Sequence, residues 1–301
     1  MTHQNPLVDS YMSSLQHKAR GTLVGYSRAI NAFLEWLGQH PGNEGGFHPE
    51  QFTKTAVQTY FTELERQYSP SYRTLVKAAL SNFANWLIEE DLLRRNPTRR
   101  LHIEAQPMLA PRVLTDRERF ILKQLVERAD DRRGDALFAL GYYAGCRVSD
   151  VSWLRMENVH LTERSGWIRV GHKGGKYREI DLAKPARQAL KDCLDQRQSE
   201  SPYVFPSQRG ERLTEPGIHH WFRNLKASAK AKEYAEIEVI SFHDLRHDFA
   251  HRAREAGWRL EEIAFYLGHI TKRGTPALQT TVRYTQVGRE QVKRKLNTIT
   301  G

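Results

Sequence analysis

The sequence is poor in cysteine: only Cys146 and Cys193 occur in 301 residues. Two thiols cannot build a disulfide framework or a zinc ribbon, which need more cysteines at fixed spacing. The chain is nevertheless long enough to form two domains with cores of their own. We therefore expect a protein of the reducing cytosol that is held together by its hydrophobic cores.

The sequence also lacks any apolar run long enough to span a bilayer. Its first residues, MTHQNPLVDS, lack the charged-then-apolar layout of a signal peptide. Both absences predict a cytoplasmic protein without a membrane partner.

Acidic residues are outnumbered, with 35 Asp and Glu against 46 Lys and Arg and a net charge of +11. Such a balance indicates a polyanionic partner. Nucleic acid is favoured over an anionic membrane because no basic amphipathic anchor stands out.

The first hundred residues have the periodicity of helices. Apolar residues recur every 3.6 residues in 22–40, in 52–68 and in 71–93, where Leu75, Ala79, Phe83, Trp86 and Leu87 form the stripe. Turn-rich segments separate these stretches. We predict a compact four-helix domain over residues 1–92 that begins near Leu7.

A basic, proline-containing stretch follows over residues 93–112 and has little periodicity, so it is predicted to be an extended linker. A second domain is predicted over 113–301, with Thr115 capping its first helix. GWIRVGHKGGKYREIDL reads as two short strands around a Gly-Gly turn. The expected fold class is mainly α with a small β-hairpin or sheet.

Arg147, in GYYAGCRVSDVSWL, follows small and apolar residues. Such a guanidinium needs an anion, because leaving a buried charge unpaired is costly. The anion is either Asp150, in an ion pair at a helix start, or a bound ligand.

SFHDLRHDFAHRAREAG is predicted to be a helix that ends at Gly257. His243 and Arg246 share a face near its positive end, which is a natural phosphate site. His243, His247 and His251 also follow i, i+4, i+8 spacing. Without a HExxH glutamate or a cysteine pair, hydrogen-bonded or surface histidines are favoured over a metal site.

Two further segments carry candidate residues. In HKGGK, Lys173 and Lys176 flank two glycines, either to reach over a ligand or to protect the edge of a short hairpin. In LGHITKRGTPALQTTVRYTQV, Gly268 ends a helix and His269 lies at its C-terminus. Tyr284 follows a turn and is either structural or a nucleophile.

Taken together, these side chains fit attack on a phosphodiester. Guanidinium groups can hold two non-bridging oxygens bidentately and stabilise the extra negative charge of the transition state, as a metal would otherwise do. A phenol becomes a nucleophile when a neighbouring imidazole accepts its proton.

The same motifs resemble those of the tyrosine recombinase (phage integrase) family. AGCRVSDVSWLRMENV is similar to its first box, HDLRHDFA to its His-x-x-Arg box, and LGH with a following T-x-x-Y to the end of its pattern. The resemblance covers residues 113–301. The N-terminal helices resemble the family's SAM-like core-binding domain by position and helix count.

The resemblance implies a role for each matching residue. Arg147 and Arg246 would clamp the scissile phosphate, with Asp150 in support. His243 would share that contact and proton transfer, and His269 would bond the phosphate and support the tyrosine. Lys173, rather than its rival Lys176, would protonate the leaving 5′-oxygen. Tyr284 would form a 3′-phosphotyrosyl link, so that no ATP, metal or other cofactor is needed.

The resemblance also implies a partner and an assembly. Two domains would clamp double-stranded DNA at a recombination site. Four protomers would exchange strands on two sites through a Holliday junction, with accessory DNA-bending proteins as possible partners, in the nucleoid of a bacterium or phage host. Integration, excision or cointegrate resolution of a mobile element would be the use. In the C-terminal tail, Val292, Leu296 and Ile299 form a stripe that would dock either on a neighbouring protomer or on its own domain.

One departure from the family pattern lies between His269 and Tyr284, which are fifteen positions apart. The extra material, TKRGTPA (271–277), is expected to form a loop and leaves open whether Tyr284 acts in its own protomer or in a neighbour. Two other functions stay open at this point: a type IB topoisomerase, and a DNA-binding regulator without catalysis. Further DNA contacts are predicted at Lys176 and at Arg73, Lys77, Arg99 and Arg100, and for the last four a solvated basic face is the alternative.

Overall fold

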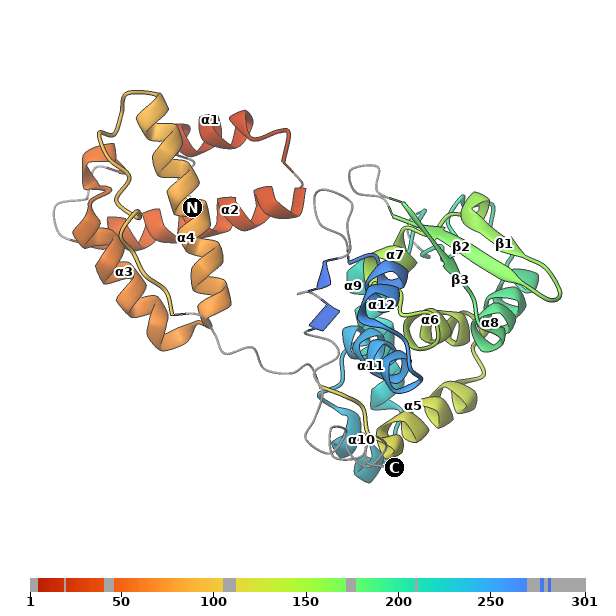
Figure 1. Cartoon of the computed structure of the whole chain (residues 1–301). Coiled ribbons are helices and arrows are strands. Elements are labelled where there is room, and N and C mark those ends of the chain that lie inside the picture. The colour runs from red at the N-terminus through yellow and green to blue at the C-terminus, as the bar shows by residue number, and fades with distance from the viewer. Residues whose placement is uncertain are drawn as a thin grey trace. The chain divides into compact units, whose positions relative to one another are not determined.

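The computed structural model describes residues 5–18, 20–40, 46–104, 112–171, 177–208, 211–269, 277–278 and 281–282. The described chain is mainly helical with one small antiparallel sheet, which confirms the predicted fold class. It divides into two compact units, Met1–Pro107 and Met108–Gly301 (Figure 1).

Among its described residues, the first unit has four helices, coloured red to orange in Figure 1, as the periodicity predicts. They are α1 (Pro6–Ser14), α2 (Arg20–Gly38), α3 (Lys54–Gln67) and α4 (Pro70–Glu89), with a 3-10 turn at Pro49–Gln51. Thr53 and Ser69 start α3 and α4, because each hydroxyl accepts a backbone N–H of the first turn. The helices enclose an aromatic core that includes Phe33, Phe52 and Phe83.

One residue of the predicted apolar stripe on α4 was placed wrongly. Leu75 is 42% exposed, whereas Val76 and Leu80 are fully buried. The buried positions 76, 80, 83 and 87 follow the helical period, and Leu75 lies one residue out of phase with them.

Residues 93–104, predicted to be part of an extended linker, pack against the first unit. Leu93, Leu101 and Ile103 contact its core. The Asn96 side-chain amide donates to the Ser81 carbonyl at 3.1 Å. This basic segment is therefore held against α4 by apolar contacts and hydrogen bonds.

The second unit contains eight helices within the described ranges and a three-stranded sheet. Its elements are α5 (Asp116–Ala129), α6 (Arg132–Tyr142), α7 (Val148–Ser152), a 3-10 turn (Met156–Asn158), β1 (Val159–Leu161), β2 (Gly166–Val170), β3 (Arg178–Asp181), α8 (Lys184–Asp195), α9 (Glu215–Ala227), α10 (Ala231–Ile237), α11 (Phe242–Glu255) and α12 (Leu260–Leu267). Thr115 caps α5 as predicted, in a capping box with Glu118.

The sheet has the antiparallel order β1-β2-β3. β2 and β3 are the predicted hairpin, with Ile168 opposite Ile180 in the buried layer. β1 was missed, because a three-residue strand is too short for alternation to reveal.

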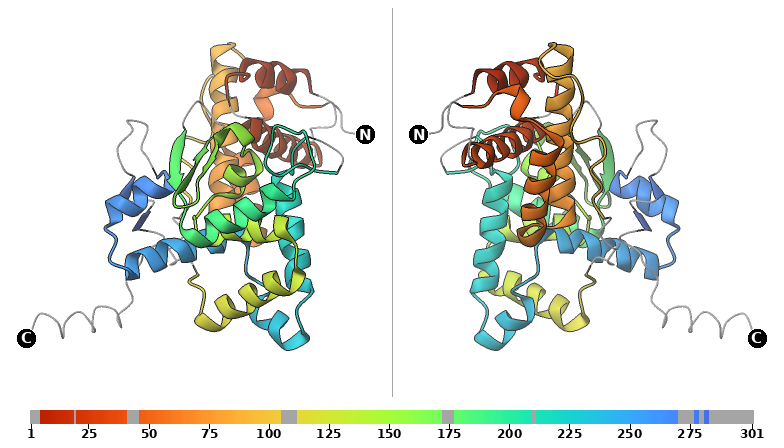
Figure 2. Two further views of the ribbon diagram at one scale, coloured as in Figure 1. Left: turned by 90° about the vertical axis from the view of Figure 1, so that its right-hand side faces the viewer. Right: turned by 90° about the vertical axis from the view of Figure 1, so that its left-hand side faces the viewer.

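Helix α6 is the centre of the second unit, and most of its residues are buried. It packs against α5, α8 and α11, while α12 packs on α11 (both blue in Figures 1 and 2). Helices α11 and α12, which carry or precede predicted site residues, are thereby anchored on one core.

None of the described helices is long and apolar enough to cross a membrane.

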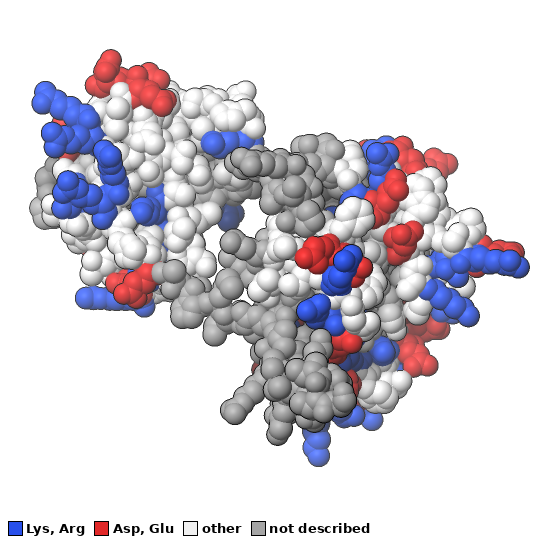
Figure 3. Space-filling view, viewed as in Figure 1, with Lys and Arg blue, Asp and Glu red and all other residues white. Residues whose placement is uncertain are grey.

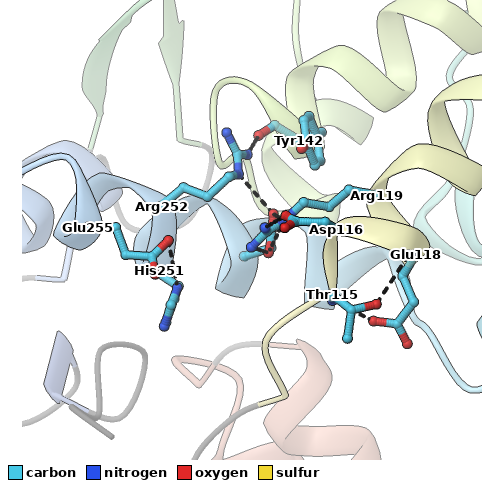
Figure 4. Close-up of polar contacts among 9 residues, drawn as sticks. Thr115, Asp116, Glu118, Arg119, Tyr142, His251, Arg252 and Glu255 are labelled. Atoms are coloured by element: carbon cyan, nitrogen blue, oxygen red, sulfur yellow. Dashed lines mark hydrogen bonds and ion pairs between the residues drawn. The ribbon is translucent and has the colours of Figure 1, made fainter. Parts of the chain in front are cut away.

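A buried carboxylate ties α11 to its neighbours. Asp248 is fully buried and accepts hydrogen bonds from Arg119 on α5 (2.7 Å) and Arg252 on α11 (2.8 Å). Figure 4 shows Arg119 and Arg252 converging, with Arg252 at the Tyr142 ring of α6, 4.1 Å from its centroid. Asp248 therefore fixes the orientation of the helix that carries His243 and Arg246.

Replacing this carboxylate should destabilise the second unit strongly. For Asp248→Asn we expect a loss of about 3–5 kcal/mol in the free energy of unfolding, because two guanidinium groups lose their buried counterion. Urea unfolding of the whole chain measures the loss. Asp116→Asn is the matched control, since Asp116 binds the same Arg119 with its side chain 99% exposed, and it should change stability by less than about 0.5 kcal/mol. Equal stability of the two variants would contradict the prediction.

Candidate active site

The guanidinium of Arg246 is the buried centre of the candidate site. Its side chain is fully buried on α11. Nη1 donates to the Gly145 carbonyl at 2.6 Å, and Nη2 donates to the Leu267 carbonyl at 2.7 Å. Backbone groups of two other segments therefore hold this cation in place.

Gly145 makes that arrangement possible. Its φ of +58° lies in the left-handed region, and a Cβ there would lie 2.8 Å from the side chains of Leu267 and Phe249. A larger residue would push α11 and α12 away from the segment that carries Arg147.

His269 links Arg246 to the segment that precedes Tyr284. Its Nε2 lies 2.9 Å from Nη2 of Arg246, and its Nδ1 lies 3.1 Å from Oγ1 of Thr281. A guanidinium can only donate, so Nε2 is the acceptor and the ring proton is on Nδ1, which donates to Thr281. Burial, together with Arg246 and Arg147, lowers the pKa of His269 to about 3, which keeps the ring neutral.

The described residues before Tyr284 fold back onto His269. The Ala277 N–H donates to the His269 carbonyl at 2.6 Å, and the Thr281 N–H donates to the Ala277 carbonyl at 3.3 Å. Thr281 is fully buried. The first residue of the T-x-x-Y motif therefore lies at the site in the same chain, three positions before Tyr284.

Arg147 reaches the same place from α7. It is the N-cap of this helix, and its Nη2 donates to the Gly268 carbonyl at 3.3 Å. Arg147 and Arg246 thus bind consecutive carbonyls at the C-terminus of α12, where the helix dipole favours cations. The structure brings Arg147, Arg246 and His269, three of the predicted site residues, together.

Asp150 is ion-paired with Arg178, which is not among the predicted site residues. Its Oδ2 lies 2.6 Å from Nη2 of Arg178 on β3 and also accepts the backbone N–H of Arg147 at 2.9 Å. Burial alone would raise the pKa of Asp150, but Arg178 and the Arg147 N–H outweigh it and lower the pKa. No local pattern in the sequence marks Arg178 as the partner of Asp150, which lies 28 positions away.

His243 lies in the first turn of α11, one turn before Arg246, and its side chain is exposed. Partial loss of hydration, followed by the charge of Arg246, lowers the pKa of His243. Partial loss of hydration, followed by the proximity of the His243 ring, lowers the pKa of His247 to about 4. His243 is therefore a neutral, solvent-accessible base at neutral pH.

The predicted DNA contacts in the first unit fall into two groups. Arg73 is 9% exposed and ion-paired with Glu65, and Lys77 donates to the Leu101 carbonyl at 2.5 Å, so both have structural partners. Arg99 and Arg100 are exposed, as are Arg94 and Arg95. Figure 3 shows Lys and Arg side chains gathered at the left-hand edge of the first unit, where the coil after α4 runs in Figure 1.

Several predicted features lie outside the described residues. These are Lys173, Lys176, Tyr284, the loop at 271–276 and the C-terminal tail with Val292, Leu296 and Ile299. Their roles stay predictions from the sequence.

The described groups suit an anion with several oxygens. Two fixed guanidinium groups supply positive charge, while neutral His243 supplies an accessible proton acceptor. Burial raises the pKa of the adjacent Cys146 thiol to about 12, so this thiol is not a nucleophile at neutral pH. A separate cavity of about 490 Å³, lined by residues of α5, α6 and α8 such as Lys123, Phe138 and Gln188, contains none of the predicted catalytic residues.

The two neutral histidines predict an acid-labile fold. In the fold, the pKa values of His247 and His269 are about 4 and about 3, below the value of about 6.5 in the unfolded chain. At a pH between the folded and unfolded pKa values, the unfolded chain binds more protons than the folded chain. The free energy of unfolding therefore falls as the pH falls. From pH 7 to pH 5 we expect a loss of about 2 kcal/mol from His269 and less from the partly exposed His247.

Urea unfolding at pH 5, 6 and 7 tests this dependence. His247→Gln should reduce the slope, whereas the same change at the exposed His17 should leave it as in the wild type. A stability that stays constant over this range would show that the two rings are not neutral in the fold.

Comparisons with known proteins agree with this architecture. A model of the phage integrase family matches residues 112–290, and a model of the phage integrase N-terminal SAM-like domain matches residues 7–93. Tyrosine recombinase XerC of Neisseria gonorrhoeae is 27% identical over 297 residues, which are 95% of this chain and 92% of the relative. Tyrosine recombinase XerC of Bacillus subtilis is 30% identical over 298 residues, which are 94% of this chain and 91% of the relative.

The fold has counterparts among solved structures. XerH site-specific recombinase, bound to palindromic difH substrate, matches with a TM-score of 0.72 and 14% identity. The match covers 98% of this chain and 84% of that one.

Proposed function

The chain belongs to the phage integrase family of tyrosine recombinases, and we propose from this membership that it recombines DNA at specific sites through a 3′-phosphotyrosyl intermediate on Tyr284. The observation that carries the proposal is the convergence of Arg147, Arg246 and His269 at the C-terminus of α12, with Thr281 bound to His269. This arrangement supports a phosphate site next to the tyrosine segment.

The proposed cleavage step exchanges one phosphate ester for another. The Tyr284 oxygen attacks phosphorus, and the bond to the 5′-oxygen breaks as the bond to tyrosine forms. Arg147 and Arg246 stabilise the added charge on the non-bridging oxygens. His243 accepts the phenol proton, and Lys173 protonates the leaving 5′-oxygen. The ester energy is conserved, so rejoining by an incoming 5′-hydroxyl needs no ATP.

His269 has a supporting part in this proposal. Its two ring nitrogens join Arg246 to Thr281, so the ring orients the arginine and the segment leading to Tyr284. Because Thr281 and His269 belong to one chain, we propose that Tyr284 acts in its own protomer.

The proposed partner is double-stranded DNA that contains a recombination site. The exposed arginines of the coil after α4 would bind backbone phosphates, which carry no sequence information of their own. Four protomers would act on two sites through a Holliday junction, with the tail stripe contributing to assembly. Integration, excision or cointegrate resolution of a mobile element is the proposed use.

Covalent capture from a randomised DNA library tests the proposal. Duplexes with random centres and a nick near the middle are incubated with the whole chain, and complexes that survive detergent are sequenced. We expect one enriched sequence family, hereafter the selected duplex. Relaxation of supercoiled plasmids that lack this sequence would favour a topoisomerase, and absence of any covalent complex would contradict cleavage.

A sulfur leaving group assigns the general acid. On the selected duplex, Lys173→Ala should slow cleavage by about 10²–10⁴-fold, the range for general acid catalysis. A 5′-sulfur at the scissile bond should restore the rate, because a thiolate leaves without protonation. Lys176→Ala is the matched control and should show no rescue specific to sulfur. Rescue of Lys176→Ala alone would move the role to Lys176.

A further inference from the structure

Arg178, the first residue of β3, lies in the predicted hairpin segment but is not among the predicted site residues. Its Nη2 lies 2.6 Å from Oδ2 of Asp150, and the two side chains are only 17% and 6% exposed. At this burial, removing one partner leaves the other charge uncompensated, so the pair is costly to break.

The same Asp150 oxygen also determines where α7 begins. Oδ2 accepts the backbone N–H of Arg147 at 2.9 Å in a capping box, and Arg147 is the N-cap residue. One carboxylate oxygen thus joins Arg178 on the sheet to the backbone of Arg147. A carboxylate without Arg178 would be protonated or would turn toward water, and the cap would loosen.

Arg178 also supports the other end of Arg147. Its aliphatic part lies against Gly268, where φ is +65° and an added Cβ would lie 2.6 Å from Cδ of Arg178. The Gly268 carbonyl accepts Nη2 of Arg147 at 3.3 Å. Arg178 therefore contacts both groups that hold Arg147: Asp150 at its backbone and Gly268 at its guanidinium.

We infer that Arg178 is a positioning residue for Arg147, acting through Asp150. This role rests on the proposed function, since Arg147 matters only if it holds a scissile phosphate. The ion pair joins β3 to α7, the helix that begins at Arg147. A displacement of the guanidinium by about 1 Å is enough to cost about 10²-fold in rate.

The test is a double-mutant cycle on the selected duplex. Arg178→Gln and Asp150→Asn should each slow formation of the covalent complex by about 10²-fold. The double variant should be no slower than either single variant, because both act through one ion pair. Arg178→Lys, which keeps the charge, should recover part of the rate. Thermal unfolding confirms that each variant is folded at the assay temperature.

Two further arms separate this role from others. The 5′-sulfur duplex should not restore Arg178→Gln, because the defect lies in phosphate binding and not in leaving-group protonation. Arg169→Gln is the matched control: Arg169 is an exposed arginine of β2 whose guanidinium lies 5.2 Å from the Tyr177 ring centroid. It should cleave at the wild-type rate.

Three results would overturn the inference: a wild-type rate for Arg178→Gln, rescue by sulfur, or losses that multiply in the double variant. Failure of the proposed function looks different, because the wild-type chain would then form no covalent complex. In that case urea unfolding of the wild type, Arg178→Gln, Asp150→Asn and the double variant still tests the ion pair. Additive losses of stability would show that Arg178 does not act through Asp150.

Discussion

Replacing Tyr284 by phenylalanine should abolish the covalent protein–DNA complex. The variant lacks only the phenolic oxygen that would bond to phosphorus, so no phosphotyrosyl ester can form. Cleavage of the selected duplex should fall below detection, while affinity in a gel-shift assay should stay near the wild-type value, because binding depends on the basic residues elsewhere.

Tyr177→Phe is the matched control. Tyr177 directly follows the HKGGK segment and is 52% exposed. Removal of its hydroxyl group should leave cleavage near the wild-type rate. Covalent capture by Tyr284→Phe would mean that another residue is the nucleophile. Mixing Tyr284→Phe with an Arg246→Gln chain tests the proposal that each protomer uses its own tyrosine: restored cleavage would show donation between protomers.

Replacing Arg246 by lysine is expected to have the next largest effect. The lysine keeps the charge but cannot bind two oxygens in a plane, so the cleavage rate should fall by at least about 10²-fold. Stability should also fall by about 1–3 kcal/mol, because the buried carbonyls of Gly145 and Leu267 lose donors. Rates are measured in single-turnover cleavage at a temperature where unfolding curves show the variant to be folded.

Arg254→Lys on the same helix provides the control. Arg254 donates to the Trp258 carbonyl at 2.9 Å, and its replacement should change the rate little. If Arg246→Lys cleaves the selected duplex at nearly the wild-type rate, Arg246 does not bind the scissile phosphate and its role is structural.

Sequence patterns predicted the parts of the structure that depend on residues close together in the chain. The four helices of the first unit, the Thr115 cap and the β2–β3 hairpin were predicted, because helical period, capping and turn chemistry act within a few positions. The predicted apolar stripe of α4 was wrong at Leu75. The adjacent Val76 is also apolar, and only packing decides that Val76 is the buried one.

Contacts between distant residues were less predictable. The pairing of Arg178 with Asp150 spans 28 positions, and that of Arg119 with Asp248 spans 129. Charges of opposite sign are frequent in this sequence, so no local pattern marks which of them meet. The packing of residues 93–104 on the first unit was missed because it also depends on contacts with residues distant in the sequence.

The sequence by itself indicated the family of this protein and the residues proposed to act. The ordered motifs that contain Arg147, His243, Arg246, His269 and Tyr284 resemble the phage integrase pattern, and the family model matches residues 112–290. Only the tertiary structure decided how these boxes are held. Carbonyls at the end of α12 orient both arginines, His269 is neutral because it is buried between Arg246 and Thr281, and a buried ion pair fixes the start of α7. These features depend on burial and on contacts between distant segments, which arise only once the chain is folded.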